Sequence, residues 1–350
     1  MSSVLVTGAA GFIGSNFVRY WRREHPGDRV VALDALTYAG VRENLLGPGG
    51  EPLDGVEFVH GSIANTDLVA HLLRAHSVDV VVNFAAESHN SLAILRPGDF
   101  FATNVMGTQG LLEAVRRVGV GRFHHISTCE VYGDLPLDAT GPGVAFTEDS
   151  PYCPRTPYNA AKAGGDHVVR SYGLTYDVPV TITNCSNNYG PFQFPEKVIP
   201  LFTTRALAGE ALPLYASTKN RREWLHVDDH AAAIDAVVHR GRVGETYNVG
   251  SGTEVDVEGI ADTVLAALGL GPQEAARLKT IVPDRPSHDR RYLLDSQKLR
   301  TELGWAPRVA WSDGIADTVA WYTANEAWWR PLLGRSPVVE GAGANWGAGS

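Results

Sequence analysis

The sequence predicts an α/β protein in which a Rossmann-type, doubly wound parallel sheet is followed by a smaller C-terminal α/β substrate lobe. Two observations support this prediction. Through the first half of the chain, short apolar runs of strand length alternate with amphipathic helical stretches. The first of these runs leads directly into a glycine-rich turn and a helix, which is how a phosphate-binding sheet of this class begins.

Six apolar runs have the length of strands rather than of helices. Helical patterns fill the intervals between them, for example Gly107–Val118 and Tyr158–Tyr176. Neighbouring parallel strands need crossover connections of this kind, so we expect the six strands to share one parallel sheet. In chain order they are Val4–Thr7, Val30–Asp34, Val56–His60, Val78–Phe84, Phe123–Ser127 and Val178–Thr183.

Beyond Asn184 the chain becomes richer in proline and its elements become shorter, which indicates a second lobe. We therefore expect a nucleotide-binding domain over residues 1–184 and a mainly substrate-binding lobe over residues 185–335. The remaining segment, 336–350, is rich in glycine and alanine, and we expect it to be a flexible tail.

The composition argues against several classes of protein. The chain has 350 residues, a formal charge of −9 and a pI near 5.7, which disfavour a nucleic-acid or membrane partner. No apolar run approaches the roughly 20 residues of a membrane span. The first strand starts at once, so we expect no signal peptide. The three cysteines and twelve histidines show no ligand spacing, so we expect a reduced, cytoplasmic protein without a metal site.

Three glycines follow the first predicted strand in the stretch TGAAGFIG. Gly8, Gly11 and Gly14 would form a tight turn, admit a pyrophosphate to the backbone and let the helix pack closely on the sheet. Asp34 ends the second strand, where a carboxylate binds ribose hydroxyls and repels a 2′-phosphate. An ordinary glycine turn with a capping aspartate is the alternative. Together these features predict binding of NAD in preference to NADP.

The stretch YNAAK places Tyr158 and Lys162 one turn apart on one helix face. A free phenol, with a pKa of about 10, is a poor base at neutral pH. A nearby ammonium and a nicotinamide cation would favour the phenolate, which could then exchange a proton with a sugar hydroxyl. The same spacing arises by chance in many helices, but the nucleotide-binding features before it favour the catalytic interpretation.

With these motifs the chain resembles the extended short-chain dehydrogenase/reductase family and, within it, the dTDP-glucose 4,6-dehydratases. The resemblance runs from about Val4 to Trp329, and its most specific motifs are NNYGP with FPEK, and DRPSHDRR. The stretches that support it are Leu33–Leu45, Asn83–His89, Thr103–Ala114, Cys185–Leu201, Arg222–His230 and Asp284–Asp295.

The resemblance implies two adjoining sites and a homodimer paired through two long helices, Asp99–Val118 and Tyr158–Tyr176. The implied NAD site comprises Gly8, Gly11, Phe12, Ile13, Gly14, Asp34, Ser62, Ile63, Phe84, Ala85, Ala86, Thr103, Tyr158, Lys162 and Asn188. The implied site for a nucleotide-diphosphate hexose, with dTDP-glucose the expected one, comprises Ser88, Thr128, Asn187, Lys197, Val198, Pro213, Tyr215, Arg222, Arg285 and His288. For the run Arg285, Arg290 and Arg291, a solvated charge cluster is the alternative, and we expect it to hold for at least one member.

The chain departs from the family pattern in four places. At the adenine edge, Gly61-Ser62-Ile63 replaces Gly-Asp-Ile. After NFAAESH, Asn90-Ser91-Leu92 replaces Val-Asp-Arg. Val257 stands near the position of a substrate-contacting asparagine. Thr128-Cys129-Glu130 replaces Thr-Asp-Glu, so that a thiol stands where the family has a carboxyl group.

That last departure bears on the chemistry. In the family mechanism, C4 of the hexose is oxidised first, which makes the C5 proton more acidic. The resemblance implies that Glu130 is the base that removes this proton. Cys129 stands at the position of the acid that helps the C6 hydroxyl to leave. A thiol with a pKa of about 8.5 is protonated at pH 7, but it is a weak hydrogen-bond donor. Three outcomes stay open: Cys129 is a slower acid, Glu130 relays the proton to O6, or the reaction ends at a 5,6-alkene. A small apolar filler is the alternative role of Cys129.

The sequence therefore predicts an NAD-dependent nucleotide-sugar dehydratase with catalytic residues Thr128, Cys129, Glu130, Tyr158 and Lys162. Alternatives on the same scaffold are a 5,6-ene-forming dehydratase, a 4-epimerase or a decarboxylase. A more remote alternative is a non-catalytic NAD(H)-binding regulator, which the complete set of catalytic residues argues against.

Overall fold

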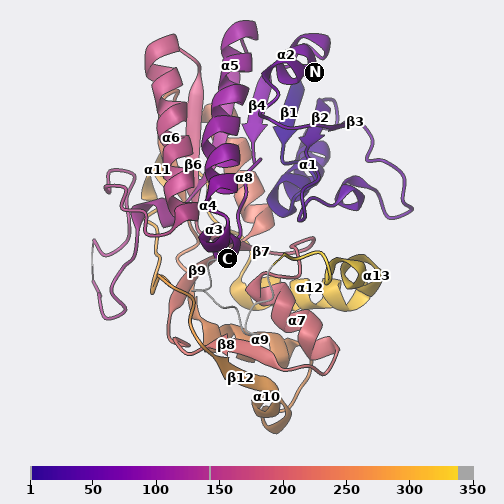
Figure 1. The fold of residues 1–350 in the computed structure, drawn as a ribbon, viewed down its shortest axis with the longest axis vertical. Coiled ribbons are helices and arrows are strands. Elements are labelled where there is room, and N and C mark those ends of the chain that lie inside the picture. The colour runs from indigo at the N-terminus through magenta and orange to yellow at the C-terminus, as the bar shows by residue number, and fades with distance from the viewer. Residues whose placement is uncertain (1, 142, 338–350) are drawn as a thin grey trace.

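The computed structural model describes residues 2–141 and 143–337. Its larger lobe is built on a seven-stranded sheet with the order β10-β6-β5-β4-β1-β2-β3 (Figure 1). Every strand pair in this sheet is parallel, which confirms the predicted fold class. The strands are β1 Ser3–Thr7, β2 Arg29–Asp34, β3 Val56–His60, β4 Val80–Asn83, β5 Arg122–Thr128, β6 Val180–Cys185 and β10 Thr246–Val249.

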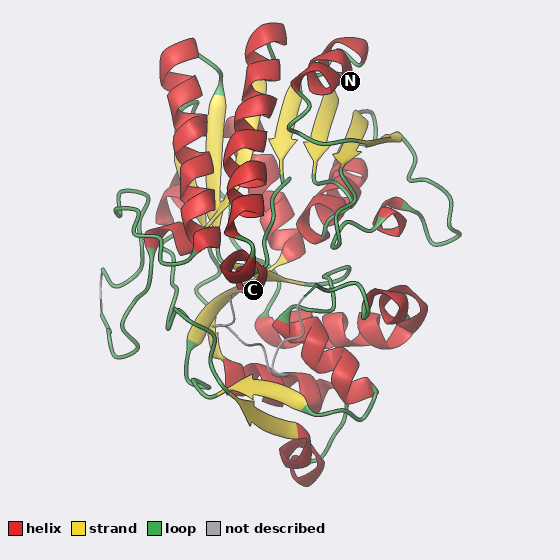
Figure 2. Ribbon diagram, in the orientation of Figure 1, coloured by secondary structure: helices red, strands yellow, loops and turns green. Residues whose placement is uncertain are grey.

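Helices cover both faces of this sheet (Figure 2). Alternate residues of β1 point to opposite faces, as a pleated strand requires. Val4 and Val6 pack with α1 and α8, whereas Leu5 packs with α2, α5 and α6. These helices are α1 Phe12–Glu24, α2 Thr66–Ala75, α5 Thr108–Val118, α6 Pro157–Tyr176 and α8 Val227–Arg240.

The large sheet takes an edge strand, β10, from beyond residue 184. β10 pairs with β6, and α8 from the same part of the chain packs on the sheet beside α1. The sequence did not predict this strand, because its four residues, TYNV, are too short to show a period. The chain therefore leaves the larger lobe after β6 and returns to it.

A helical stretch made of three short segments leads into α5. It comprises α3 Asn90–Leu95, α4 Pro97–Phe101 and a π-helical segment, η2 Ala102–Gly107. Single turns of π-helix are frequent at functional sites. Three 3₁₀ turns and one further helix complete the elements outside the smaller lobe: η1 Arg42–Leu45, η3 Cys129–Tyr132, η4 Arg330–Leu332 and α11 Gln297–Leu303.

The smaller lobe has its own apolar core, in which Phe202, Leu214, Trp224 and Val264 are buried. Two small sheets contribute to it, β11-β9-β7 and β12-β8. The expected tail lies outside the described residues from 338 onward. No helix in the described part of the chain is long and apolar enough to cross a membrane. The elements are β7 Asn187–Tyr189, β8 Leu212–Tyr215, β9 Arg221–His226, β11 Glu254–Asp256, β12 Lys279–Val282, α7 Val198–Leu207, α9 Val257–Ala267, α10 Pro272–Leu278, α12 Trp311–Ala324 and α13 Glu326–Trp329.

Candidate active site

A cleft of about 540 Å³ is lined by residues of both lobes. Gly8 and Asp34 line it from the carboxyl ends of β1 and β2, and Tyr215 and Arg222 line it from the smaller lobe. The carboxyl ends of parallel strands are where this class of sheet binds ligands. The cleft brings together all the site residues expected from the sequence except Cys129.

The turn after β1 is so tightly packed that no side chain can be accommodated at Gly8 or Gly14. Gly8 has φ of +62°, and a Cβ atom there would lie 2.7 Å from the backbone nitrogen of Ala85. A Cβ on Gly14 would lie 2.2 Å from the carbonyl oxygen of Gly8. No side chain in the described structure caps the N-terminus of α1 at Gly11, so its first amides are available to an anion. This geometry fits a pyrophosphate.

Asp34 is fixed at the end of β2 by two backbone amides. Its carboxylate accepts hydrogen bonds from Ala10 N at 2.9 Å and from Leu36 N at 2.7 Å. Burial raises the pKa of Asp34, and these hydrogen bonds oppose that shift. The carboxylate lines the cleft next to the glycine turn, in the position expected for a ribose contact.

The loop after β4 is held by the π-helical segment. Asn104 accepts a hydrogen bond from Glu87 N at 2.8 Å and donates one to Glu87 O at 3.0 Å. Thr103, the neighbouring residue in η2, lines the cleft together with Phe84–Ser88. The π-helical geometry therefore holds the loop and Thr103 against the same wall of the cleft.

Tyr158 is partly buried and Lys162 is buried on the wall formed by α6. Lys162 Nζ donates a hydrogen bond to Ile126 O at 2.6 Å, and burial lowers the pKa of this ammonium. Burial and the charge of Glu130 raise the pKa of Tyr158 well above 10, whereas the Thr128 hydroxyl lowers it. Lys162 Nζ thus contacts the β5 backbone while lining the same cleft as Tyr158. The expected help of the ammonium and of a bound nicotinamide cation in forming the phenolate stays a prediction.

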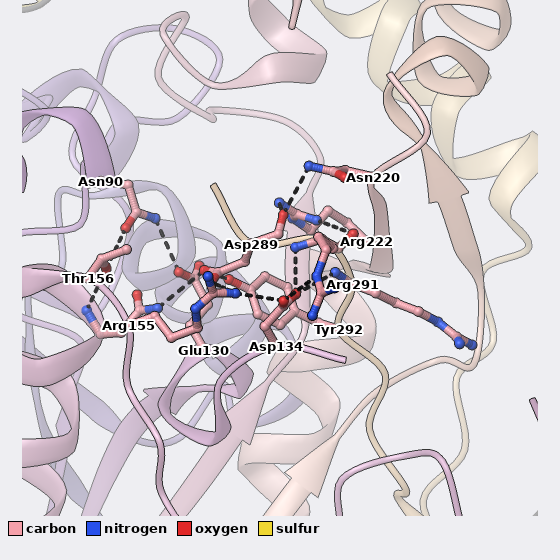
Figure 3. Close-up of polar contacts among 12 residues, drawn as sticks. Asn90, Glu130, Asp134, Arg155, Thr156, Asn220, Arg222, Asp289, Arg291 and Tyr292 are labelled. Carbon is pink, nitrogen blue, oxygen red and sulfur yellow. Dashed lines mark hydrogen bonds and ion pairs between the residues drawn. The ribbon is translucent and has the colours of Figure 1, made fainter. Parts of the chain in front are cut away.

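Glu130 is held by a chain of hydrogen bonds that the sequence did not reveal. Asn90 Nδ2 donates to Glu130 Oε2 at 3.1 Å, and Thr156 Oγ1 donates to Asn90 Oδ1 at 3.1 Å (Figure 3). Thr156 also caps α6 by accepting a hydrogen bond from Asn159 N. Burial raises the pKa of Glu130, and the hydrogen bond from Asn90 opposes it. The departure at Asn90 was the sequence signal that could have indicated this contact.

Cys129 faces away from the cleft. It follows β5 directly in η3, and consecutive side chains there point in different directions, so Thr128 and Glu130 line the cleft while Cys129 does not. The thiol is 1% exposed and packs with Val131 and Tyr132. Burial raises its pKa well above the usual value. The structure favours an apolar filler over the acid that the sequence position suggested.

Basic side chains gather at the end of the cleft formed by the smaller lobe. Lys197 Nζ donates to Ser88 O at 3.0 Å, and the Arg222 guanidinium lies 4.8 Å from the centre of the Tyr292 ring. Arg285 also lines the cleft. Two further arginines do not: Arg290 pairs with Asp134 at 2.6 Å and Arg291 with Glu254 at 2.6 Å.

His288 and Tyr215 lie beside these basic groups. His288 Nδ1 lies 3.0 Å from Asp284, and burial lowers the pKa of His288 to about 4, so the imidazole is neutral at pH 7. Its ring centre lies 4.9 Å from that of Tyr215. Pro213 and Val198 also line this end of the cleft.

Two neighbouring asparagines of β7 differ in their partners. Asn188 donates to Ser186 O at 2.9 Å, and its Oδ1 lies 2.9 Å from His230 Nδ1. Asn187 Oδ1 is buried and has no hydrogen-bond partner within the described structure. A buried acceptor left without a partner costs roughly 1–3 kcal/mol. A hydroxyl of a bound ligand would relieve that cost.

The arrangement matches a known protein family. The family model described as GDP-mannose 4,6 dehydratase matches residues 5–318. The chain belongs to this dehydratase family. A dTDP-glucose 4,6-dehydratase of Streptomyces niveus is 48% identical over 333 residues, which cover 94% of this chain and 95% of that relative.

Solved structures of the dehydratase family and its neighbours have the same fold. A dTDP-glucose 4,6-dehydratase from Bacillus anthracis, solved in complex with NAD, matches with a TM-score of 0.85 and 42% identity, covering 95% of this chain and 100% of the other. A UDP-glucose 4-epimerase from Thermus thermophilus, also in complex with NAD, matches with a TM-score of 0.81 and 31% identity, covering 92% and 99%. The resemblance found in the sequence is thus confirmed.

Proposed function

We propose that this protein is an NAD-dependent dehydratase that oxidises the hexose of a nucleotide diphosphate at C4 and removes water across C5 and C6, with dTDP-glucose as the substrate. The observation that carries the proposal is that one cleft is lined by Tyr158 and Glu130, by the carboxylate of Asp34, and by the basic side chains Arg222 and Arg285. The relatives named above as dTDP-glucose 4,6-dehydratases support the choice of substrate.

The cleft fits NAD at three points. The amides of the glycine turn would bind the pyrophosphate, Asp34 would bind the adenosine ribose, and the π-helical wall with Thr103 would border the nicotinamide half. Bound NAD would supply the two-electron acceptor for oxidation at C4 and the donor for the later reduction. An aspartate at this position disfavours NADP, because a 2′-phosphate would meet a carboxylate.

The substrate diphosphate would lie against Lys197, Arg222 and Arg285. Guanidinium groups bind phosphate oxygens with paired donors, and a protein with a net charge of −9 needs such a local cluster to hold an anion. The unpartnered carbonyl of Asn187 would accept a hydrogen bond from the ligand.

The catalytic residues then have separate tasks. Tyr158 would accept the proton of the C4 hydroxyl, with Thr128 donating a hydrogen bond to its oxygen. Glu130 would take the C5 proton from the 4-keto sugar. Because Cys129 does not line the cleft, we assign to Glu130 the second half of the elimination as well: it returns that proton to O6, the C6–O bond breaks, and water leaves.

The absence of Cys129 from the cleft lining also leads to a second candidate product, a 5,6-alkene. If Glu130 delivers its proton to O6, hydride addition at C6 builds a carbanion at C5, and that carbanion needs a new proton. With the thiol of Cys129 packed in the apolar cluster, reduction back at C4 would instead leave a 5,6-alkene.

Incubation with dTDP-glucose and NAD in deuterium oxide, read by NMR, tests both candidates. We expect a 4-keto-6-deoxy product that carries deuterium at C5. A 5,6-alkene would support the second candidate. A C4 epimer without exchange at C5, or unchanged substrate, would contradict elimination.

We also propose a homodimer and a cytoplasmic location. The helical layers α4–α5 and α6 expose apolar side chains, among them Phe101 (42%), Met106 (61%) and Leu174 (88%). A pairing of these helices with those of a second copy would bury them. The three cysteines are free, as in a reducing compartment. A monomeric mass in solution at micromolar concentration would contradict the dimer.

A further inference from the structure

Two histidines and an aspartate meet on the far side of the nucleotide-binding lobe from the small sheets. His25 follows the last turn of α1, and Asp235 and His239 lie one turn apart on α8. Their three ligand atoms lie within 4.8 Å of one another. None of the three residues lines the cleft. Because α1 packs against α8, the fold brings together groups that lie far apart in the sequence.

The three groups lie at hydrogen-bond distances, which small side-chain shifts would convert into the separations found around one ion. Asp235 Oδ1 lies 3.1 Å from His25 Nε2 and 2.7 Å from His239 Nδ1. Ligands bound to tetrahedral zinc at about 2.0–2.1 Å are separated by about 3.3 Å. The widest separation in the cluster can close by rotation of the His239 side chain, which is 46% exposed. Two imidazoles and one carboxylate leave one position open for water.

The surroundings orient these groups. The Trp21 ring packs against both imidazoles, with centres 4.4 Å from His25 and 5.3 Å from His239. Tyr20 donates a hydrogen bond to the second oxygen of Asp235 at 3.2 Å, which leaves Oδ1 turned toward the histidines. A partner that orients a metal-binding carboxylate is a regular part of metal sites.

The local charge also suits a dication. Asp235 is a partly buried carboxylate that contacts both imidazoles. Asp28 lies close enough to act on His239 through its charge, and Glu24 and Arg23 both lie near Tyr20. A hydrogen-bonded triad of two histidines and an aspartate, without an ion, is the competing explanation of the geometry.

We propose that His25, Asp235 and His239 form a Zn²⁺ site that joins the end of the phosphate-binding helix α1 to α8. Imidazole and carboxylate ligands with an open position suit Zn²⁺ among the common divalent ions. The ion would act as a structural clamp, since the cluster lies outside the cleft and touches none of the proposed catalytic groups. The clamp would stabilise the lobe without taking part in the reaction.

Metal analysis of the tag-free, full-length protein tests this site. After dialysis against Zn²⁺ and then against metal-free buffer, we expect one Zn²⁺ per chain and a higher thermal midpoint than for the chelator-treated protein. His239→Ala should lose the bound ion and the thermal shift while keeping dehydratase activity and the far-UV circular dichroism of the parent. His71→Ala is the matched control, because His71 is an exposed histidine of α2 outside the cluster, and it should keep both.

Two further readouts separate the clamp from chance binding. Co²⁺ in place of Zn²⁺ should give a visible absorption band that disappears in Asp235→Asn. Tyr20→Phe should weaken the binding of Zn²⁺ by roughly tenfold, as loss of an orienting partner does. Absence of bound Zn²⁺ in the parent protein, or retention of the ion in both His239→Ala and Asp235→Asn, would overturn the proposal.

Discussion

The side-chain amide of Asn90 donates a hydrogen bond to Glu130 Oε2 across 3.1 Å. Asn90 stands at the start of α3 and Glu130 in the turn after β5, so the contact joins two loops at the carboxyl edge of the large sheet. Since the donor favours the charged form of the acceptor, the contact favours the carboxylate form of Glu130 in a site where burial works against ionisation.

The first prediction concerns this pair. Asn90→Val should raise the pKa of Glu130, because a bond that favours the carboxylate is lost. A hydrogen bond to a charged group contributes roughly 1.5–3 kcal/mol, or roughly one to two pH units. A base works only when deprotonated, so the acidic limb of the kcat–pH profile should move to higher pH by about that amount.

Thr156 provides the control for this prediction. Thr156→Ser keeps the hydroxyl that orients Asn90 and should leave the profile in place, whereas Thr156→Val should reproduce part of the shift. An unchanged acidic limb in Asn90→Val would remove Asn90 from the mechanism.

The second prediction concerns Tyr158. Tyr158→Phe removes the proton acceptor for C4 oxidation but keeps the aromatic ring that lines the cleft, so kcat should fall by roughly 10²–10⁴-fold. Calorimetry should give nearly unchanged binding of NAD and of the sugar nucleotide. A variant with most of its activity would rule out the assigned role.

The third prediction concerns cofactor choice. Asp34→Ala should lose affinity for NAD and gain relative affinity for NADP, since the carboxylate that repels a 2′-phosphate is gone. Dissociation constants for both cofactors measure the ratio. Asp54→Ala, which removes a fully exposed carboxylate, is the control and should keep the parent ratio. A parent protein that binds both cofactors equally would contradict the assignment.

The fourth prediction concerns the thiol. Cys129→Ala should keep kcat within a few-fold, because the side chain packs in the apolar cluster with Val131 and Tyr132. It should lower the free energy of unfolding by about 1 kcal/mol through the small cavity that remains. Cys129→Asp should unfold more readily, since it buries a charge. Faster dehydration by Cys129→Asp would instead identify the thiol as a substitute acid.

Much of the cleft could be predicted from the sequence because parallel strands bring their following loops to one edge. Gly8, Asp34 and Thr128 each follow or end such a strand, so their proximity follows from topology. The contact between Asn90 and Glu130 could not be predicted in this way, because it depends on which way two side chains point. The orientation of Cys129 toward the core could not be predicted either, because it depends on the backbone of the turn after β5.

Contacts between helices that are distant in the sequence could also not be predicted from it. His25 and Asp235 are separated by 210 residues, and no ligand spacing in the sequence predicts their contact. The edge strand β10 was missed because four residues show no period. Both features depend on the return of the chain to the larger lobe after β7, β8 and β9 have formed part of the smaller one.

That return has a consequence for synthesis on the ribosome. Until residues 246–249 emerge, β6 has an unpaired edge, although all six of its residues are buried in the finished protein. At about 5–20 residues per second, the roughly 60 residues between the two strands leave this edge open for several seconds. An open apolar edge is a site for pairing with other chains. Nascent chains of this protein therefore pass through an interval in which β6 can pair with other chains, and pauses in translation between the two strands would lengthen it.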